Sequence, residues 1–469
     1  MVSLGALARD SACFALASVL FCVAMLLGQA EHSDYGGSFF ALLAFCLYGI
    51  VLFSGLARGV INPFRIVPAI TMMWYIYPFI YIFMVDDAAL SFPVPVLWAS
   101  GANIVAAALI AFLFSYLIGG VSLTLEASTA GRLLGLAGMA SVMQLLAILG
   151  GFWTYLGAAA EGVGPIIAFM SFLGLFVLPI AALNAALPAH EGRAFRKWII
   201  IGFIAAVQIA WLSVDGRRML ANVMLVSLLV YLHAALSARK PGLRDLMSFA
   251  FSTLVISICV YVLWRYFFHV RHTHYFLQSR GNAYPGLWDI MQAMGQVDLP
   301  ALDAAFAENV VMRPFIIQSV AAFEQAHLGL LWGQGLVADM LNAIPSAFGI
   351  DKSGLLVAEG LWASQLGVPH NDWANTLYLD GYADFGIAGL TIYILCVWVV
   401  MKAALFIVAL SSPIARLPVL ISFLVMLISV ESSIGTVFAG FRNTAILCAL
   451  LVVGRFARQL LPGNRAMRA

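Results

Sequence analysis

The stretch GIAGLTIYILCVWVVMKAALFIVA, residues 386–409, contains a single charged side chain, Lys402. The hydrocarbon core of a bilayer is crossed by a helix of about 20 apolar residues, so this stretch has the length and character of a membrane span. Similar windows recur along the chain. We place them at residues 11–28, 38–57, 66–84, 98–118, 133–151, 164–187, 198–213, 219–236, 248–268, 386–409, 417–431 and 440–456. The sequence therefore predicts an all-α polytopic membrane protein with about twelve transmembrane helices.

The overall composition supports this fold class. Of the 469 residues 63% are hydrophobic and 10% are charged, and the mean hydropathy is +0.99. Soluble domains contain about 45–50% apolar and about 25% charged residues, so a soluble fold is excluded. No clear small-residue cleavage site follows the first apolar run, and we expect a retained span rather than a signal peptide. All six cysteines lie in apolar runs without CxxC spacing, which indicates small packing residues rather than disulfides or metal ligands.

The windows divide the chain into three parts. Residues 1–268 contain transmembrane helices 1–9, residues 269–385 form a large loop, and residues 386–469 contain helices 10–12 and a cytoplasmic tail. The loop is mixed rather than polar, with helical periodicity over residues 302–330 and glycine and proline breakers between short segments. We expect short packed helices that partly skim the membrane surface.

The basic residues orient the spans. With the N-terminus inside, sixteen of the 24 Lys and Arg residues fall in cytoplasmic segments, whereas most of the opposite short loops carry acidic residues instead. Cytoplasmic loops of membrane proteins are enriched in Lys and Arg, so this distribution predicts that both termini are cytoplasmic and that the large loop is outside.

Eight basic residues remain on the outer side, and seven of them are arginines. They are Arg217, Arg218, Arg265, Arg271, Arg280, Arg313, Lys352 and Arg442. Guanidinium groups are suited to bidentate contacts with phosphate oxygens. A charged side chain at a helix end or at membrane depth is energetically costly unless it has a partner. These residues are therefore functional candidates. The alternative is that they reach lipid headgroups or pair locally, for example with Asp215.

The end of the large loop is the densest polar region of the chain. It runs from Pro369 to Asp384 and includes His370, Asn371, Asp372 and Tyr382. A histidine there has the right pKa to act as a general base on a hydroxyl group, but His370 and Asn371 equally fit a helix cap. Glu431, after a later apolar run, fits either a partner for an outer arginine or a helix cap.

A second group of histidines follows Arg265. His269, His272 and His274 have a spacing that does not suit one helical face, and no carboxylate lies close to them in the sequence. We interpret them as interfacial residues beside Tyr275 and expect no metal.

The order of these motifs resembles the O-antigen polymerase and O-antigen ligase superfamily. The motifs are "SVDGRRML" opening a span, "MRPFIIQSV" in the loop, a "GQGL" turn, and "PHNDWANTLYLDGYADFGIAGL" leading into the next span. The resemblance covers most of the chain as architecture. It implies a C-type glycosyltransferase at the periplasmic face of the bacterial inner membrane, acting on glycans carried by undecaprenyl pyrophosphate.

The resemblance also implies the partners of the reaction. It implies no metal, no cofactor and no nucleotide sugar, and it makes the lipid-linked oligosaccharide and membrane lipid the binding partners. A chain-length regulator of the polysaccharide co-polymerase type and a flippase are the implied protein partners, and nucleic acid is not among them.

The resemblance assigns site residues as well. Arg217 or Arg218 matches the arginine that opens a span in the family, Arg313 matches its loop arginine, and His370 with Asn371 matches the ligase-like pair. The candidate catalytic residues are His370, Arg313, Arg217, Asp372 and Asp384. The candidate substrate-binding residues are Arg218, Arg280, Arg442, Asn371, Tyr382 and Glu431.

The expected mechanism is a direct displacement at the anomeric carbon. The arginines hold the donor pyrophosphate and stabilise its developing charge, while His370, Asp372 or Asp384 accepts the proton of the acceptor hydroxyl. These distant stretches are expected to converge around one outward-facing cavity that is open to the lipid.

Three activities fit such a chain. In the ligase pattern the His-Asn pair lies closer to the glycine that opens the next span, whereas here Gly386 follows His370 by sixteen residues. This favours a polymerase that joins lipid-linked repeat units over a ligase that transfers the glycan to lipid A core. A flippase or transporter is the alternative from another class, but transporters usually show repeated halves with broken helices. A scaffold or channel subunit is disfavoured because pores place polar rings within their spans.

Overall fold

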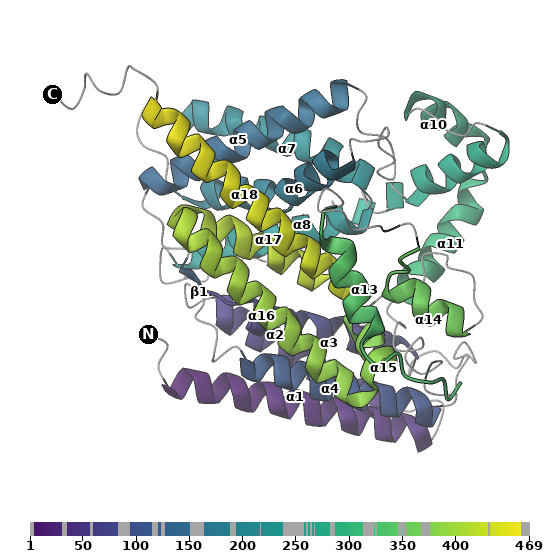
Figure 1. Cartoon of the computed structure of the whole chain (residues 1–469). Coiled ribbons are helices and arrows are strands. Elements are labelled where there is room, and N and C mark those ends of the chain that lie inside the picture. Colours follow the sequence, from purple (N-terminus) through teal and green to yellow (C-terminus); the bar gives the residue numbers. More distant parts are fainter. Residues whose placement is uncertain are drawn as a thin grey trace. The chain divides into compact units, whose positions relative to one another are not determined.

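The computed structural model is built almost entirely of helices, which confirms the all-α prediction (Figure 1). It describes residues 4–30, 35–56, 60–82, 94–114, 121–122, 127–150, 164–187, 194–215, 217–237, 258, 261–262, 265–266, 268–281, 287–312, 323, 326–345, 352, 354–366, 376–429 and 432–460. The strands in this part of the chain are two residues each, β1 (Val60–Ile61) and β2 (Val121–Ser122), and they pair with each other.

The chain folds as two compact units. The first comprises Met1–Leu52, Asn62–Val121 and Phe315–Ala469, and the second comprises Phe53–Ile61 and Ser122–Pro314. The predicted loop of residues 269–385 is therefore divided at Pro314, with its first part in the second unit and its second part in the first unit.

The first unit contains helices from both the N-terminal and the C-terminal part of the chain, and the candidate site lies in this unit. They are α1 (Leu4–Ala30), α2 (Tyr35–Leu56, whose last turn belongs to the second unit), α3 (Pro63–Ile82), α4 (Val94–Phe114), α13 (Gln334–Ala343), α14 (Ala358–Leu366), α15 (Leu377–Phe385), α16 (Ile387–Ser411), α17 (Arg416–Ile428) and α18 (Ile434–Leu460). A short 3₁₀ turn, η5 (Pro413–Ala415), joins α16 to α17.

Within the described residues, the second unit contains long helices and several shorter ones. They are α5 (Ala127–Leu149), α6 (Gly164–Ala186), α7 (Ala194–Asp215), α8 (Arg217–Ser237), α10 (Leu287–Ala293) and α11 (Leu299–Met312), with the 3₁₀ turn η2 (Met294–Gln296) between the last two. Residues 268–279 are also helical.

Six helices in the described part of the chain are long and apolar enough to cross a membrane. Their apolar segments are Ala8–Leu27, Thr129–Leu149, Ile166–Ala186, Ala194–Leu212, Ile387–Ser411 and Ile434–Gly454. Shorter apolar helical segments cover Gly37–Leu52, Gly101–Leu113, Met219–Ala235 and Arg416–Ile428. The chain is thus a multi-pass membrane protein. Most of the expected window at 248–268 lies outside the described residues.

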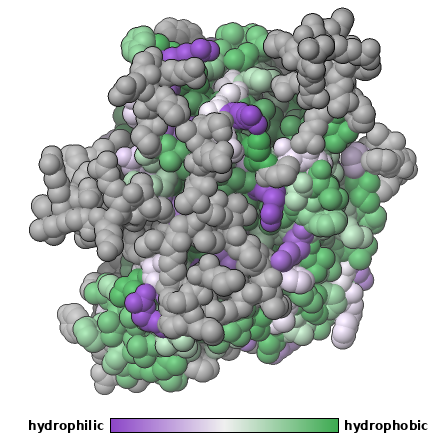
Figure 2. Space-filling model, turned by 90° about the vertical axis from the view of Figure 1, so that its left-hand side faces the viewer, coloured by the Kyte–Doolittle hydropathy of each residue, from purple (hydrophilic) through white to green (hydrophobic). Residues whose placement is uncertain are grey.

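Large apolar side chains point outward from these spans. Leu149 is 74% exposed, Phe195 80% and Leu410 70%. Where the residues in Figure 2 are coloured, that face is mostly apolar with separate hydrophilic patches. Such exposure is unfavourable in water and favourable against lipid, which agrees with the membrane assignment.

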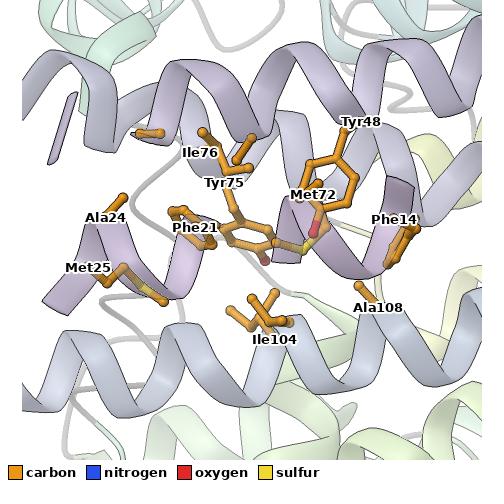
Figure 3. Packing of buried hydrophobic residues seen from close by; sticks show 14 of the residues in the cluster. Phe14, Phe21, Ala24, Met25, Tyr48, Met72, Tyr75, Ile76, Ile104 and Ala108 are labelled. Carbon is orange, nitrogen blue, oxygen red and sulfur yellow. The ribbon is translucent and has the colours of Figure 1, made fainter. Parts of the chain in front are cut away.

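Aromatic packing holds the first four helices together. Phe14 on α1 stacks on Phe112 of α4 with ring centroids 4.4 Å apart, and meets Tyr48 of α2 edge-on at 4.9 Å. Side chains from α1 to α4, including Phe21 and Tyr75, point toward one another in Figure 3. Burial of each aromatic ring contributes a few kcal/mol to the stability of the fold. Helices α16 and α17 pack against α4 and α3 of this cluster.

A pair of glycines brings α15 against α16. A Cβ atom on Gly389 would lie 1.7 Å from the carbonyl oxygen of Gly381, so no other residue fits there without moving one helix. Gly386 between the two helices has φ 62°, a left-handed conformation that glycine adopts at little cost. The side chain of Thr376 accepts a hydrogen bond from Leu379 N at 2.9 Å and starts α15. The end of the predicted loop is therefore fixed tightly to a membrane helix.

Candidate functional site

The short helix α13 lies at the centre of the candidate site, among α14, α15 and α18 (Figure 1). Its N-terminus is held by a carboxylate from α15. Asp384 Oδ1 accepts a hydrogen bond from Gly335 N at 3.0 Å, and its Oδ2 accepts bonds from Leu336 N at 2.8 Å and from the hydroxyl of Tyr393 at 2.6 Å. Negative charge at a helix N-terminus is stabilising, and the side chain is fully buried. These bonds make Asp384 an anchor for α13.

A second carboxylate joins the starts of two other helices. Asp339 on α13 accepts a hydrogen bond from Ala358 N at 3.2 Å through Oδ1, and one from Gly435 N at 3.1 Å through Oδ2. Ala358 begins α14, and Gly435 is the second residue of α18. Asp339 is 4% exposed, and burial raises the pKa of its carboxyl group despite these two bonds. One side chain therefore links the loop to a membrane helix.

A third carboxylate, Asp380, lies deeper. Its Oδ1 accepts a bond from the indole N–H of Trp362 at 3.2 Å, whereas its Oδ2 has no hydrogen-bond partner among the residues that the structure describes. Asp380 is 1% exposed, and burial together with the negative charge of Asp339 raises its pKa well above the ordinary value. A buried carboxyl group beside another carboxylate binds its proton more strongly than an exposed one, because a second buried negative charge is costly.

Two basic side chains meet the other end of α13. Arg442 on α18 donates from Nη1 to the carbonyl of Ala343 at 3.3 Å and from Nε to Oδ1 of Asn443 at 3.1 Å. Lys352 donates to the carbonyl of Asn342 at 2.6 Å. Cations are stabilising at the C-terminus of a helix, where carbonyl groups lack partners.

Arg442 also lines a polar pocket, which we call the Arg442 pocket. It has a cavity volume of about 200 Å³ and is lined by Asp339, Asn342, Ala343, Val357, Glu359, Ser433, Gly435, Ala439 and Arg442. Arg442 forms no ion pair with any residue in the described part of the chain, although Asp339 and Glu359 line the same pocket. Its Nη2 group therefore has N–H donors available for an anion in the pocket.

A second pocket, which is apolar, lies among α3, α4, α15, α16 and α17. It has a cavity volume of about 60 Å³ and is lined mainly by Pro63, Phe64, Val67, Leu390, Ile394, Val397 and Leu427, with Tyr378 and Tyr393. The hydroxyl group of Tyr393 reaches Asp384, and Asp384 holds the N-terminus of α13. A ten-residue helix is roughly 15 Å long. The N-terminus of α13 is thus connected through Asp384 and Tyr393 to the apolar pocket. Its C-terminus borders a polar pocket, where no described residue accepts a hydrogen bond from Nη2 of Arg442.

No family model, no curated protein and no solved structure matches this chain.

The structure shows the contacts of several of the predicted site residues. Asp384 and Arg442, 58 residues apart in the sequence, hold opposite ends of the same short helix. Tyr382 on α15 packs against an apolar cluster, its ring edge-on to Phe323 at 6.3 Å. Arg280 is exposed, with its guanidinium 4.2 Å from the centre of the Phe276 ring.

Other predicted residues are not placed in this site. Arg217 begins α8, and Arg218 follows it in that helix of the second unit, where Arg280 also lies. Arg313, His370, Asn371, Asp372 and Glu431 lie outside the described residues. The expected convergence of all these stretches stays a prediction.

The histidine cluster has a partner that the sequence did not indicate. Asp303 on α11 lies 2.9 Å from Nε2 of His269 and accepts two hydrogen bonds from Arg265, one of them at 2.7 Å. No carboxylate is close to these histidines in the sequence, but the fold brings Asp303 of α11, 34 positions after His269, next to that residue. Among the described residues no group of three His, Cys, Asp or Glu side chains is placed to hold a metal ion.

The sequence analysis missed Asp339 and Glu359 and gave no role to Asp380. A signal for Asp339 was present: it lies in QGLVADMLNA, residues 334–343, where it is the one charged residue of a predominantly apolar segment. A lone acid in such a segment indicates a buried, bonded carboxylate. Glu359 stands in a mixed segment and gives no comparable signal.

Proposed function

We propose that this chain is a membrane glycosyltransferase of the C type. It extends a glycan by joining oligosaccharide repeat units carried on undecaprenyl pyrophosphate, on the periplasmic face of the bacterial inner membrane, as in O-antigen or exopolysaccharide synthesis. About twelve spans, with both termini in the cytoplasm, form the proposed topology.

The main support for this proposal is the environment of Arg442, which lacks a described counter-ion. It lies in a candidate membrane span, lines a polar pocket, and forms no ion pair with any described residue. A basic side chain at such a depth is expensive to keep without a counter-ion. A pyrophosphate group supplies that counter-ion, and the planar guanidinium edge suits its oxygens.

The apolar pocket and the Arg442 pocket suit the two halves of such a donor. The carrier lipid is a hydrocarbon chain, for which we assign the apolar pocket between α3, α15, α16 and α17. The pyrophosphate and first sugar are assigned to the Arg442 pocket, where Asn342 and Ser433 add polar groups for hydroxyls.

The proposed reaction is a direct displacement. The acceptor hydroxyl attacks the anomeric carbon of the donor, and the sugar–pyrophosphate bond breaks. Arg442 stabilises the charge that develops on the departing pyrophosphate. The guanidinium group performs here the electrostatic work that a metal ion performs in metal-dependent sites where a phosphate group departs.

Deletion of the gene distinguishes the polymerase from its alternatives. Because the polymerase joins repeat units, its loss is expected to leave a single repeat unit attached to lipid A core, which is measured by gel electrophoresis and mass spectrometry of lipopolysaccharide. Long chains that stay on the carrier lipid would instead identify a ligase. Single units retained on the cytoplasmic side would identify a flippase, and an unchanged ladder would contradict all three activities.

A further inference from the structure

Asp339 is a firmly positioned acid in the wall of the Arg442 pocket. Each of its oxygens accepts one backbone N–H, from Ala358 at 3.2 Å and from Gly435 at 3.1 Å. These bonds fix the carboxylate at the pocket wall, and each oxygen retains a lone pair for a further proton donor. A carboxylate held in one orientation beside bound substrate satisfies the first geometric requirement for a general base.

We propose that Asp339 is the general base of the transfer, the residue that takes the proton from the attacking sugar hydroxyl. This inference rests on the proposed function and names a residue for it. The O–H bond of the acceptor breaks and its proton moves to Asp339, while the oxygen forms the new bond to the anomeric carbon. The electron pair of the broken carbon–oxygen bond leaves with the pyrophosphate, beside Arg442.

The neighbours of Asp339 adjust its strength as a base. Burial raises its pKa most, the two backbone N–H groups lower it, and the negative charges of Asp384 and Glu359 raise it again. Asp380 on α15 is also buried, and burial raises the pKa of its carboxyl group as well. Arg442 on α18 lines the same pocket. A carboxylate whose pKa is raised binds a proton more strongly, which makes it a better base near neutral pH.

The other acids in this region are less suited to the task. All of the bonding of Asp384 is directed to α13 and Tyr393, away from the wall of the Arg442 pocket, and Asp384 does not line that pocket. Asp380 does not line it either. Glu359 does line it, so experiment must separate Glu359 from Asp339.

The first test is Asp339→Asn, measured with purified protein in liposomes. The probe is the lipid-linked glycan fraction extracted from membranes of a strain that lacks this gene. Loss of a general base is expected to lower the rate of chain extension by about 10²- to 10⁴-fold. The matched control is Asp298→Asn, since Asp298 also caps a helix, by accepting from Ala301 N at 3.2 Å, but does not line the pocket. Activity of Asp339→Asn equal to that of the control would overturn the assignment.

The second test does not require a variant at Asp339. The base must be deprotonated, so the rate should rise with pH through the pKa of Asp339. Glu359→Gln removes a negative neighbour that raises this pKa, and the rising limb of the pH–rate profile should therefore move to lower pH. An unmoved limb, or a limb that disappears in Glu359→Gln or in His370→Ala, would assign the base elsewhere. A wild-type protein that extends no glycan would instead refute the proposed function itself.

Discussion

Arg442→Ala is expected to abolish glycan extension and to weaken binding of inorganic pyrophosphate. The guanidinium has N–H donors that no described residue uses, and a hydrogen bond to a charged group contributes about 1.5–3 kcal/mol. Its loss should weaken pyrophosphate binding by roughly 10- to 150-fold. The rate should fall by about 10²- to 10³-fold, because charge on the leaving group is no longer stabilised. Calorimetry in detergent measures the affinity, and liposome assays measure the rate.

Two further variants make this result interpretable. Arg442 also bonds the carbonyl of Ala343, so alanine removes a contact at the C-terminus of α13. Arg442→Lys keeps a cation there but removes the planar fork, and it should fold normally while binding pyrophosphate weakly. Lys402→Ala removes a basic residue from another candidate span, away from the pocket, and should bind as wild type does. Wild-type affinity in Arg442→Ala would reduce this residue to a helix cap.

Gly389→Ala is expected to destabilise the protein and disrupt the candidate site, because it separates α15 from α16. A methyl group there would lie 1.7 Å from the carbonyl oxygen of Gly381, and both atoms belong to helix backbones that have little freedom to move. Overpacking of this kind costs about 3 kcal/mol or more. Because α15 carries both Asp380 and Asp384, its displacement also removes the anchor of α13.

Thermal unfolding in detergent, followed by tryptophan fluorescence, tests this expectation. Gly202→Ala in α7 is the matched control, since a Cβ atom there has open space around it. In a helix interior this change should stabilise the protein by about 0.5–1 kcal/mol. Equal unfolding temperatures for the two variants would show that the close contact of α15 and α16 is not what holds the loop in place.

The long helices could be predicted from the sequence because each apolar segment is recognisable from its own composition. The window at 386–409 became α16, Ile387–Ser411, and the window at 164–187 became α6, Gly164–Ala186. Such windows follow from the composition of about 20 consecutive residues and need no knowledge of distant contacts.

The candidate site was only partly readable. Arg442 was selected from the sequence as an outer arginine, and Asp384 as part of the polar end of the large loop. Their partners lie 99 and 48 residues away along the chain, at Ala343 and Leu336. Asp339 is the contrasting case. Its two hydrogen-bond donors lie 19 and 96 residues away in the sequence, so Asp339 on α13 joins α14 and α18. The hydrophobic pattern within one window of sequence does not predict such distant contacts.

The most direct test of the central claim is chain extension by the purified wild-type protein alone. Protein in liposomes is mixed with the lipid-linked glycans extracted from a strain that lacks this gene, and the products are sized by gel electrophoresis and mass spectrometry. We predict a ladder of carrier-linked glycans whose steps equal one repeat unit, formed without added metal or nucleotide sugar. Glycans that keep their original length would contradict the account.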